Sequence, residues 1–379
     1  MTVHLVDATL FFSPTSGGVR RYLLTKHEWF RRRAHVRHTL VVPGPRDRIG
    51  TDGIVEFASR RILAGYRIPL LLRRVRDLVE GLEPDVMEAA DPYQVGWQVA
   101  RLAETSGVPA VAFCHSDLVS LAEQRLGPAA GHTAAGYLRR LYEHFAIVLA
   151  PSRIVADRLR AAGIRHVQVL PLGVDPQVFS PARRDHTLRA RIGLAANSRI
   201  LTFAGRLAPE KNLPHLIEMI DQLGPPYHLL IVGGARARRP AANVTILPYQ
   251  SDPRAVAALL AASDALVHAG LQETFGLIAL EAMACAIPIA CYGGGALAEI
   301  VDERTGVVAA APHPASLAAA VADLFAQDPW QRGQAARRHV LAHYSWDAVF
   351  HRQLQIYGSL LGRRLSRERL DWTAARAQG

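Results

Sequence analysis

The chain has 379 residues, of which half are hydrophobic and one fifth are charged, with proline and glycine scattered along its length. A single hydrophobic core rarely serves a chain this long, so the length predicts two domains, and the composition excludes a disordered or fibrous protein. No apolar run approaches the roughly 20 residues that span a bilayer, and the opening residues lack a secretory leader. We therefore expect a cytoplasmic protein, either free or peripheral on the inner face of the membrane.

The net charge of +11 is concentrated in one stretch. Residues 20–76 hold 15 Lys or Arg against 4 Asp or Glu, which leaves the rest of the chain close to neutral. Such a stretch can attract an anionic membrane surface, although a solvated, arginine-rich surface without a partner explains it equally well. Nucleic-acid binding is disfavoured, because aromatic residues are sparse here and no helix-turn-helix, zinc or RNA-binding signature is present.

Short apolar runs alternate with amphipathic helical patterns, which predicts parallel sheets covered by helices on both faces. The expected strands form two series, 3–8, 39–43, 54–58, 86–90, 110–115, 147–151 and 167–172, then 200–204, 228–232, 244–247, 265–268, 287–291 and 307–309. Between them, residues 171–181 read PLGVDPQVFSP, whose prolines are typical of an exposed connection. We expect an α/β protein with domains at residues 1–175 and 176–345, then a helix from Trp346 to Leu361 and a basic tail ending at residue 379.

The most informative segment is QETFGLIALEAMACAIPIACYGGG, residues 272–295. Its two glutamates, Glu273 and Glu281, are eight positions apart, a spacing that puts two helical side chains on one face. Glu273, however, precedes the helix, which opens with the residues from Thr274 to Gly276. Because a helix start binds phosphate, Glu273 would face a sugar and Glu281 a ribose. Without context, the same residues are a capping carboxylate and a surface carboxylate of an amphipathic helix.

Expected strands flank this segment, ALVHAG before it and PIACY after it, and the second leads into three consecutive glycines, 293–295. Ligands of open α/β sheets bind beyond the carboxyl ends of the strands. Glycines let a backbone approach a ligand closely and donate amide hydrogen bonds to it, although such a run can also be a simple loop.

A second cluster follows the strand LTFA, where Gly205 and Arg206 end the strand and Lys211 precedes a helix. A diphosphate leaving group gains charge as its bond to the sugar breaks, so fixed cations stabilise the transition state more than the ground state. The alternative is a solvated loop with a capping lysine. No Asp-x-Asp pair occurs in the chain, so we expect no metal-held diphosphate.

In the first domain, Gly17 and Gly18 precede a helical pattern, a geometry that also suits phosphate. No G-x-G-x-x-G follows any expected strand, which disfavours a nicotinamide or flavin enzyme. His115 ends the strand AVAFCH and precedes Ser116 and Asp117, so it lies at the carboxyl edge of the first sheet. A lone histidine there is more often structural than catalytic.

Taken in order, these motifs resemble family 4 of the retaining GT-B glycosyltransferases, also called glycosyl transferases group 1, over essentially the whole chain. The matching pieces are GGVRRY, FCHSD, APSRIVADRLRAAG, PLGVDPQVF, FAGRLAPEKN and ETFGLIALEAMACAIPIA. The resemblance implies two Rossmann-like domains that face a central cleft, and a final helix that crosses back onto the first domain. The chain departs from the family at Leu172, where many relatives have Asn, and in the basic segment 231–240, which bears on contacts to the nucleotide.

The same resemblance implies roles for individual residues. Arg206 and Lys211 would bind the donor diphosphate, Glu273 the donor sugar and Glu281 the ribose, and His115 would lie beside the transferred sugar. The donor site would be completed by residues that contribute backbone amides or close packing: Gly17, Gly18, Gly205, Phe275, Gly276, Gly294, Gly295, Ala296 and Leu297.

As a function, the resemblance implies transfer of a hexose, mannose or glucose, from a UDP- or GDP-sugar to a hydroxyl of a lipid-linked or glycan acceptor. Configuration would be retained without metal or cofactor, and the leaving phosphate would take the acceptor proton. Two alternatives stay open. A non-hydrolysing nucleotide-sugar epimerase would change the donor without any acceptor, and a catalytically silent scaffold would bind nucleotide sugar only.

Overall fold

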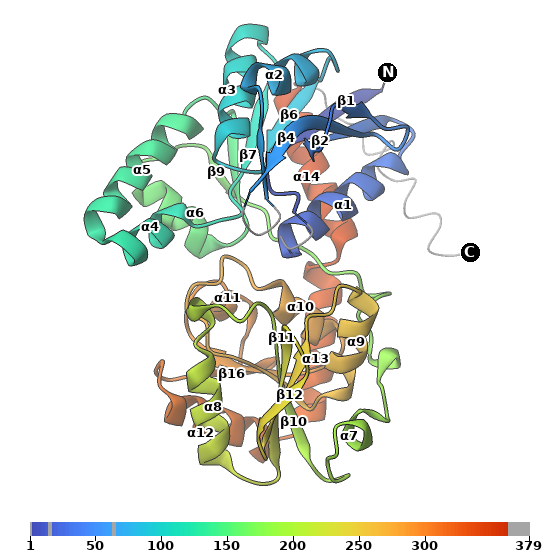
Figure 1. Cartoon of the computed structure of the whole chain (residues 1–379), viewed down its shortest axis with the longest axis vertical. Helices are drawn as coiled ribbons and strands as arrows, with labels where there is room; N and C mark the ends of the chain where they lie inside the picture. The colour runs from blue at the N-terminus through green and yellow to red at the C-terminus, as the bar shows by residue number, and fades with distance from the viewer. Residues whose placement is uncertain (1, 14–16, 63–65, 363–379) are drawn as a thin grey trace. The chain divides into compact units, whose positions relative to one another are not determined.

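The computed structural model describes residues 2–13, 17–62 and 66–362. The chain folds into two compact units (Figure 1), unit 1 with Met1–Leu170 and the chain from Asp347 onward, and unit 2 with Pro171–Trp346. The two connecting segments are hydrogen-bonded to each other, Val174 N to Tyr344 O at 2.8 Å. The division therefore falls after Leu170 and Trp346, rather than after residues 175 and 345. The basic tail from residue 363 lies outside the described residues.

Unit 1 is built on a sheet with the strand order β3-β4-β2-β1-β6-β7-β8-β9, in which β5 also pairs with β4. β3 and β5 run antiparallel to β4, and the other described pairs are parallel. The strands are β1 (Val3–Ala8), β2 (Val36–Gly44), β3 (Arg48–Ile49), β4 (Ile54–Arg61), β5 (Arg67–Pro69), β6 (Val86–Ala89), β7 (Ala110–Phe113), β8 (Ile147–Ala150) and β9 (Val167–Val169). Every residue of β1 is buried, as in a central strand covered on both faces.

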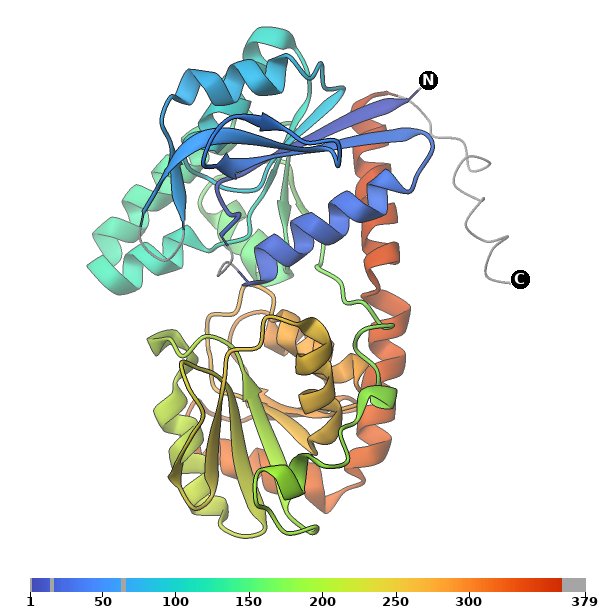
Figure 2. The same ribbon diagram turned by 45° about the vertical axis from the view of Figure 1, so that its right-hand side comes forward.

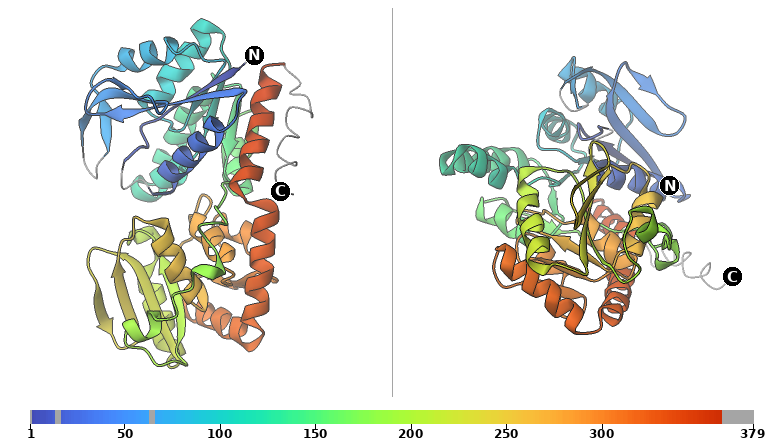
Figure 3. Two further views of the ribbon diagram at one scale, coloured as in Figure 1. Left: turned by 90° about the vertical axis from the view of Figure 1, so that its right-hand side faces the viewer. Right: turned by 60° about the horizontal axis from the view of Figure 1, so that its bottom comes forward.

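Helices cover both faces of this sheet (Figure 2). One apolar core joins the sheet to α2 (Leu72–Glu80), α3 (Gln94–Ser106), α5 (Pro128–Tyr142) and α6 (Arg153–Ala161), and α4 (Leu118–Leu126) packs on α5. The helices α1 (Gly17–Arg31) and α14 (Trp346–Leu360) lie side by side on the other face, dark blue and red in Figure 3. The last helix of the described residues thus completes the fold of unit 1.

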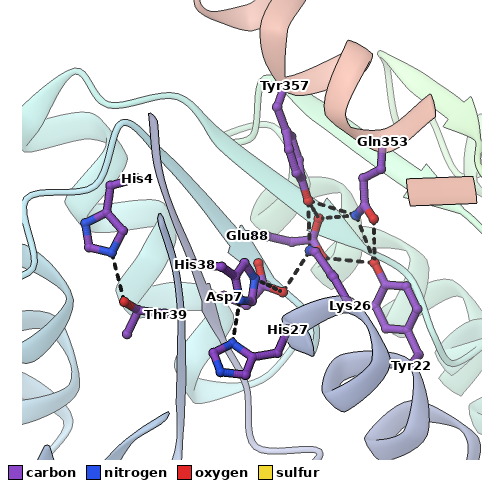
Figure 4. Close-up of polar contacts among 10 residues, drawn as sticks. All are labelled: His4, Asp7, Tyr22, Lys26, His27, His38, Thr39, Glu88, Gln353 and Tyr357. Carbon is purple, nitrogen blue, oxygen red and sulfur yellow. Dashed lines mark hydrogen bonds and ion pairs between the residues drawn. The ribbon is translucent and has the colours of Figure 1, made fainter. Parts of the chain in front are cut away.

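A group of buried polar side chains attaches α14 to this face (Figure 4). The Lys26 cluster consists of Asp7, Tyr22, Lys26, Glu88, Gln353 and Tyr357. Lys26 Nζ lies 2.7 Å from both Asp7 Oδ2 and Glu88 Oε1, and it donates to the Tyr357 hydroxyl at 2.8 Å. From α14, Gln353 Nε2 donates to Glu88 Oε2 at 2.9 Å, and the Tyr357 hydroxyl donates to the same oxygen. Burial favours the neutral form of Asp7, but Lys26 and His38 together outweigh it and lower the pKa of Asp7 to about 2.

Unit 2 contains a second sheet with the strand order β12-β13-β11-β10-β14-β15-β16, parallel except for β12 against β13. Its strands are β10 (Arg199–Ala204), β11 (Tyr227–Gly234), β12 (Arg238–Ala241), β13 (Val244–Pro248), β14 (Ala265–His268), β15 (Ile289–Tyr292) and β16 (Gly306–Ala309). One core lies beneath α8 (Leu213–Leu223) and α12 (Pro314–Ala326), and another beneath α7 (Leu188–Arg191) and α9 (Pro253–Ala262). The remaining helices are α10 (Leu277–Ala284), α11 (Leu297–Ile300) and α13 (Pro329–His343).

Local sequence signals set several of these helix boundaries. Ser152 Oγ accepts a hydrogen bond from Val155 N and starts α6, and Gly163 follows that helix with a φ of +82°. Asp252 and Asp328 cap α9 and α13 in the same way, each followed by a proline at the first helical turn. The helices that flank the sheets are thus specified by their own end residues as well as by their apolar faces.

Candidate active site

The loop between β14 and α10 carries Glu273, and a lysine and a histidine hold its carboxylate. Lys211 Nζ forms a close ion pair with Glu273 Oε1, and His268 Nε2 lies 3.0 Å from the same oxygen. Glu273 precedes α10 as predicted, but the helix starts at Leu277, after the residues Thr274 to Gly276 that were expected to open it. Three side chains from separate segments therefore meet at the carboxyl edge of the second sheet, where open α/β sheets bind their ligands.

The charge state of this triad follows from its contacts. Burial alone favours the protonated form of Glu273, but the hydrogen bond from His268 and the charge of Lys211 outweigh it and lower its pKa to about 2. His268 Nδ1 accepts a hydrogen bond from Gly270 N at 3.1 Å, so Nε2 carries the proton donated to Glu273. At neutral pH, Glu273 is a fixed carboxylate that still has acceptor capacity for hydroxyl groups.

The segment after β10 supplies the cations. Lys211 ends the short 3₁₀ helix Pro209–Lys211, and Asn212 follows in the left-handed region with a φ of +50°. Asn212 Nδ2 donates to Ala269 O at 2.9 Å, which ties this segment to the loop that carries Glu273. Lys211 is thus held in place, whereas the Arg206 side chain is 73% exposed and lies 3.5 Å from Glu210. One cation is fixed in the loop cluster, and the other extends into solvent.

A glycine turn after β15 packs on the Glu273 loop. Ala296 N donates to Glu273 O at 2.8 Å. Gly295 has a φ of +62°, and a Cβ atom there would lie 2.6 Å from Glu273 O. Gly276 has a φ of +87°, and its Cβ atom would lie 2.7 Å from the Leu297 side chain. Only glycine fits these two positions, so both turns depend on their glycines to approach each other.

Several predicted site residues are buried beside this group. Phe275 is buried in the loop before α10, and Glu281 is buried on that helix. Gly205 directly follows β10 with a φ of +156°, and a Cβ atom on neighbouring Gly233 would overlap Gly205 O. The structure thus brings together Lys211, Glu273 and the turns at Gly276 and Gly295. The assigned contacts of Glu281 to ribose and of Arg206 to diphosphate stay predictions.

The other predicted residues belong to unit 1. Gly17 and Gly18 were expected just before a helix and are the first two residues of α1. His115 follows β7 and stacks on Phe113, with ring centroids 4.2 Å apart and planes 2° apart, and the Tyr22 ring is 5.0 Å away. Burial, with the nearby charge of Lys26, lowers the pKa of His115 to about 3. His115 is therefore a neutral imidazole at physiological pH, unable to act as a cation in the ligand-free protein.

Sequence analysis missed two residues of the unit 2 site, His268 and Asn212. His268 ends the apolar strand ALVH, and the only available signal was a polar residue at the carboxyl end of a buried strand. Within the described ranges, no three His, Cys, Asp or Glu side chains group as a metal site would require. None of the described helices has the length and apolar character needed to cross a bilayer.

Known proteins share both the sequence and the architecture. The family described as Glycosyltransferase Family 4 matches residues 16–178, and Glycosyl transferases group 1 matches residues 185–339. A GDP-mannose-dependent alpha-mannosyltransferase of Mycolicibacterium smegmatis is 32% identical over 370 residues, covering 93% of this chain and 96% of that protein. The chain belongs to glycosyltransferase family 4. This glycosyltransferase is also 29% identical over 383 residues to a GDP-mannose-dependent alpha-(1-6)-phosphatidylinositol dimannoside mannosyltransferase of Mycobacterium tuberculosis, covering 94% and 97% of the two chains.

Solved structures show that the fold of this glycosyltransferase is GT-B. Sucrose-phosphate synthase from Thermosynechococcus elongatus superposes with a TM-score of 0.78 at 21% identity, covering 95% of this chain and 99% of that chain. HepE of Anabaena, solved in complex with UDP and glucose, superposes with a TM-score of 0.75 at 19% identity, covering 95% of this chain and 100% of that chain. At these identities the likeness concerns the fold alone.

Proposed function

We propose that this glycosyltransferase transfers a mannosyl group from GDP-mannose to a hydroxyl of a lipid-linked or glycan acceptor. The observation that carries the choice of donor is the 32% identity, over 93% of the chain, to an enzyme described as GDP-mannose-dependent. The acceptor class rests on the relative that acts on a phosphatidylinositol dimannoside. Glucose from a UDP-sugar is the second candidate, because the resemblance to the family allows both sugars and both nucleotides.

The loops around Glu273 suit the departure of a nucleoside diphosphate. In the proposed reaction, the bond from the anomeric carbon to the phosphate oxygen breaks, and charge grows on the diphosphate. Lys211 and Arg206 would stabilise that charge, and they would do so more strongly in the transition state than in the ground state. Glu273, ionised and next to Lys211, would accept hydrogen bonds from sugar hydroxyls, so that one ion pair aligns both parts of the donor.

We further propose that configuration is retained and that no metal is needed. The acceptor oxygen would attack from the face that the diphosphate leaves, and the departing phosphate oxygen would take the acceptor proton. No side-chain base is then required opposite Glu273. The neutral His115 imidazole in unit 1 would contact a hydroxyl of the sugar, which needs hydrogen bonding and no charge.

A thermal-shift panel with GDP, UDP, ADP and their hexose conjugates tests the donor, because a ligand that binds only the folded state raises the midpoint. We expect GDP and GDP-mannose to raise it most, and a larger shift with UDP-glucose would overturn the mannosyl assignment. Incubation with GDP-mannose, a glycolipid acceptor and a metal chelator then tests the reaction, with the anomeric configuration of the product read by NMR. Epimerised donor without an acceptor would indicate the epimerase, and donor binding without any product a silent scaffold.

A further inference from the structure

The hairpin β4–β5 and the start of α2 expose a group of large aliphatic side chains. Leu70 is 62% exposed and Leu71 is 71% exposed, and each of the nearby residues Ile62, Ile68 and Leu72 is more than a third exposed. From the sequence alone, the apolar run Ile68–Leu72 would be expected to be buried in a hydrophobic core. In the structure it lies on the surface of unit 1, between short strands at one edge of the sheet and the first turn of a helix.

Strand pairing places part of this group on one outward face. Arg60 pairs with Ile68, and Leu70 N donates to Ala58 O, so these side chains alternate with the inward-facing ones. Val55, Phe57 and Ser59 on the same strand are buried, which identifies the other face as the inner one. Ile68 and Leu70 therefore project outward together with Arg60, and the next two residues, Leu71 and Leu72, are also exposed at the start of α2.

Arginines are frequent in the same segment. Residues 57–76 contain six arginines and no acidic residue. Arg67 holds the hairpin through the Ser59 hydroxyl at 3.0 Å and the Ser59 carbonyl at 2.7 Å, and Arg74 pairs with Asp47. Arg60, Arg61 and Arg73 of the same segment are exposed. We call Arg60, Arg61, Ile62, Ile68, Leu70, Leu71, Leu72 and Arg73 the leucine–arginine surface.

We propose that the leucine–arginine surface docks unit 1 on an anionic lipid bilayer. Its aliphatic side chains would enter the boundary between headgroups and acyl chains, and its arginines would contact lipid phosphates. The combination argues against nucleic acid, because bases stack on aromatic rings and phosphate contacts need no exposed leucine. The proposal goes beyond the transfer reaction and does not depend on it, since a docked enzyme could act on any acceptor held at that membrane.

The test is co-sedimentation of the full chain with vesicles of phosphatidylcholine, alone or mixed with phosphatidylglycerol, at low and high salt. We expect binding to the mixed vesicles, weakened by salt because exposed charges are screened. Leu70→Ser/Leu71→Ser should weaken this binding by at least about tenfold, since both side chains lose their apolar contact with lipid. Arg60→Gln/Arg61→Gln/Arg73→Gln should weaken it to a similar extent and remove most of its salt dependence.

Leu126→Ser is the matched control, because Leu126 is 78% exposed at the end of α4, outside the leucine–arginine surface. It should bind vesicles like the wild type. The proposal is overturned if the wild type ignores the mixed vesicles at low salt, or if the serine double variant binds them as tightly as the wild type. The thermal shift with nucleotide should be the same in every variant, which separates this surface from the donor site and verifies folding.

Discussion

Replacing Lys211 by methionine removes the charge that faces Glu273 and keeps most of the side-chain volume. The pKa of Glu273 lies near 2 in the folded protein, against an ordinary value of 4.5. At about 1.4 kcal/mol for each pH unit, folding gains roughly 3 kcal/mol from the ionised carboxylate at neutral pH. The hydrogen bond from His268 supplies part of this gain, so we expect Lys211→Met to lower the free energy of unfolding by roughly 2 kcal/mol at pH 7.

The pH dependence of this loss has a definite sign. A lowered carboxyl pKa stabilises the folded state fully above the unfolded pKa of 4.5, and the stabilisation is lost as the pH falls towards 2. The difference between wild type and Lys211→Met should therefore shrink between about pH 5 and pH 3. Urea unfolding followed by circular dichroism measures it, with Lys211→Met/Glu273→Gln as the companion variant. That double variant buries no unpaired charge and should recover to within about 1 kcal/mol of the wild type.

Two results would refute this reasoning. If Lys211→Met unfolded at the same urea concentration as the wild type at pH 7, Lys211 would not be holding the carboxylate. If the double variant were as unstable as the single one, the loss would come from packing rather than from charge. Both variants should lack transferase activity whatever their stability, because each has lost Lys211. Unfolding therefore reports on the ion pair in the folded protein, and activity reports on its proposed role in binding the donor.

Three further predictions concern other parts of the molecule. Arg206→Ala should lower kcat/KM at least about 100-fold without changing stability by more than about 0.5 kcal/mol. Arg304 is the matched control, because its side chain is 75% exposed and also pairs with a carboxylate, and Arg304→Ala should leave the kinetics unchanged. Gly295→Ala should cost about 1–3 kcal/mol and weaken binding of the donor in thermal-shift titrations, because its Cβ atom would push the backbone of Glu273. Gln353→Leu should destabilise unit 1 by about 1–3 kcal/mol in urea unfolding, since it removes the buried hydrogen bonds that Gln353 Nε2 donates to Glu88 and to the Tyr22 hydroxyl.

The sequence predicted strands that are buried on both faces, because their apolar runs need no knowledge of partners. It also predicted that Glu273 precedes its helix, although it placed the helix start at Thr274 to Gly276, whereas Gly276 is the cap before Leu277. It did not reveal that Lys211 and His268 meet Glu273, because Lys211 is 62 positions away and nothing local marks the pair. Such contacts depend on strand order, which brings β10 and β14 together.

The basic stretch, residues 20–76, also shows that the sequence does not reveal which residues are buried. Counting charges in residues 20–76 treats all of them as surface, yet Lys26 is fully buried between Asp7 and Glu88. For the apolar run Ile68–Leu72 the sequence misleads in the opposite direction: its hydrophobic residues are expected to be buried, but Ile68, Leu70, Leu71 and Leu72 are exposed. Burial depends on which elements cover a segment, and neither composition nor periodicity contains that information.

The Lys26 cluster also ties the folding of this protein to the order of its synthesis. Lys26 and Glu88 are translated before Gln353 and Tyr357, which lie at least 265 positions further along the chain and complete their hydrogen bonds. Until α14 emerges, the ion pair between Lys26 and Glu88 would lack the cover of that helix, while the whole second unit is made. A chain truncated before residue 353 is therefore expected to leave these polar groups without their partners from α14, even when both sheets have formed.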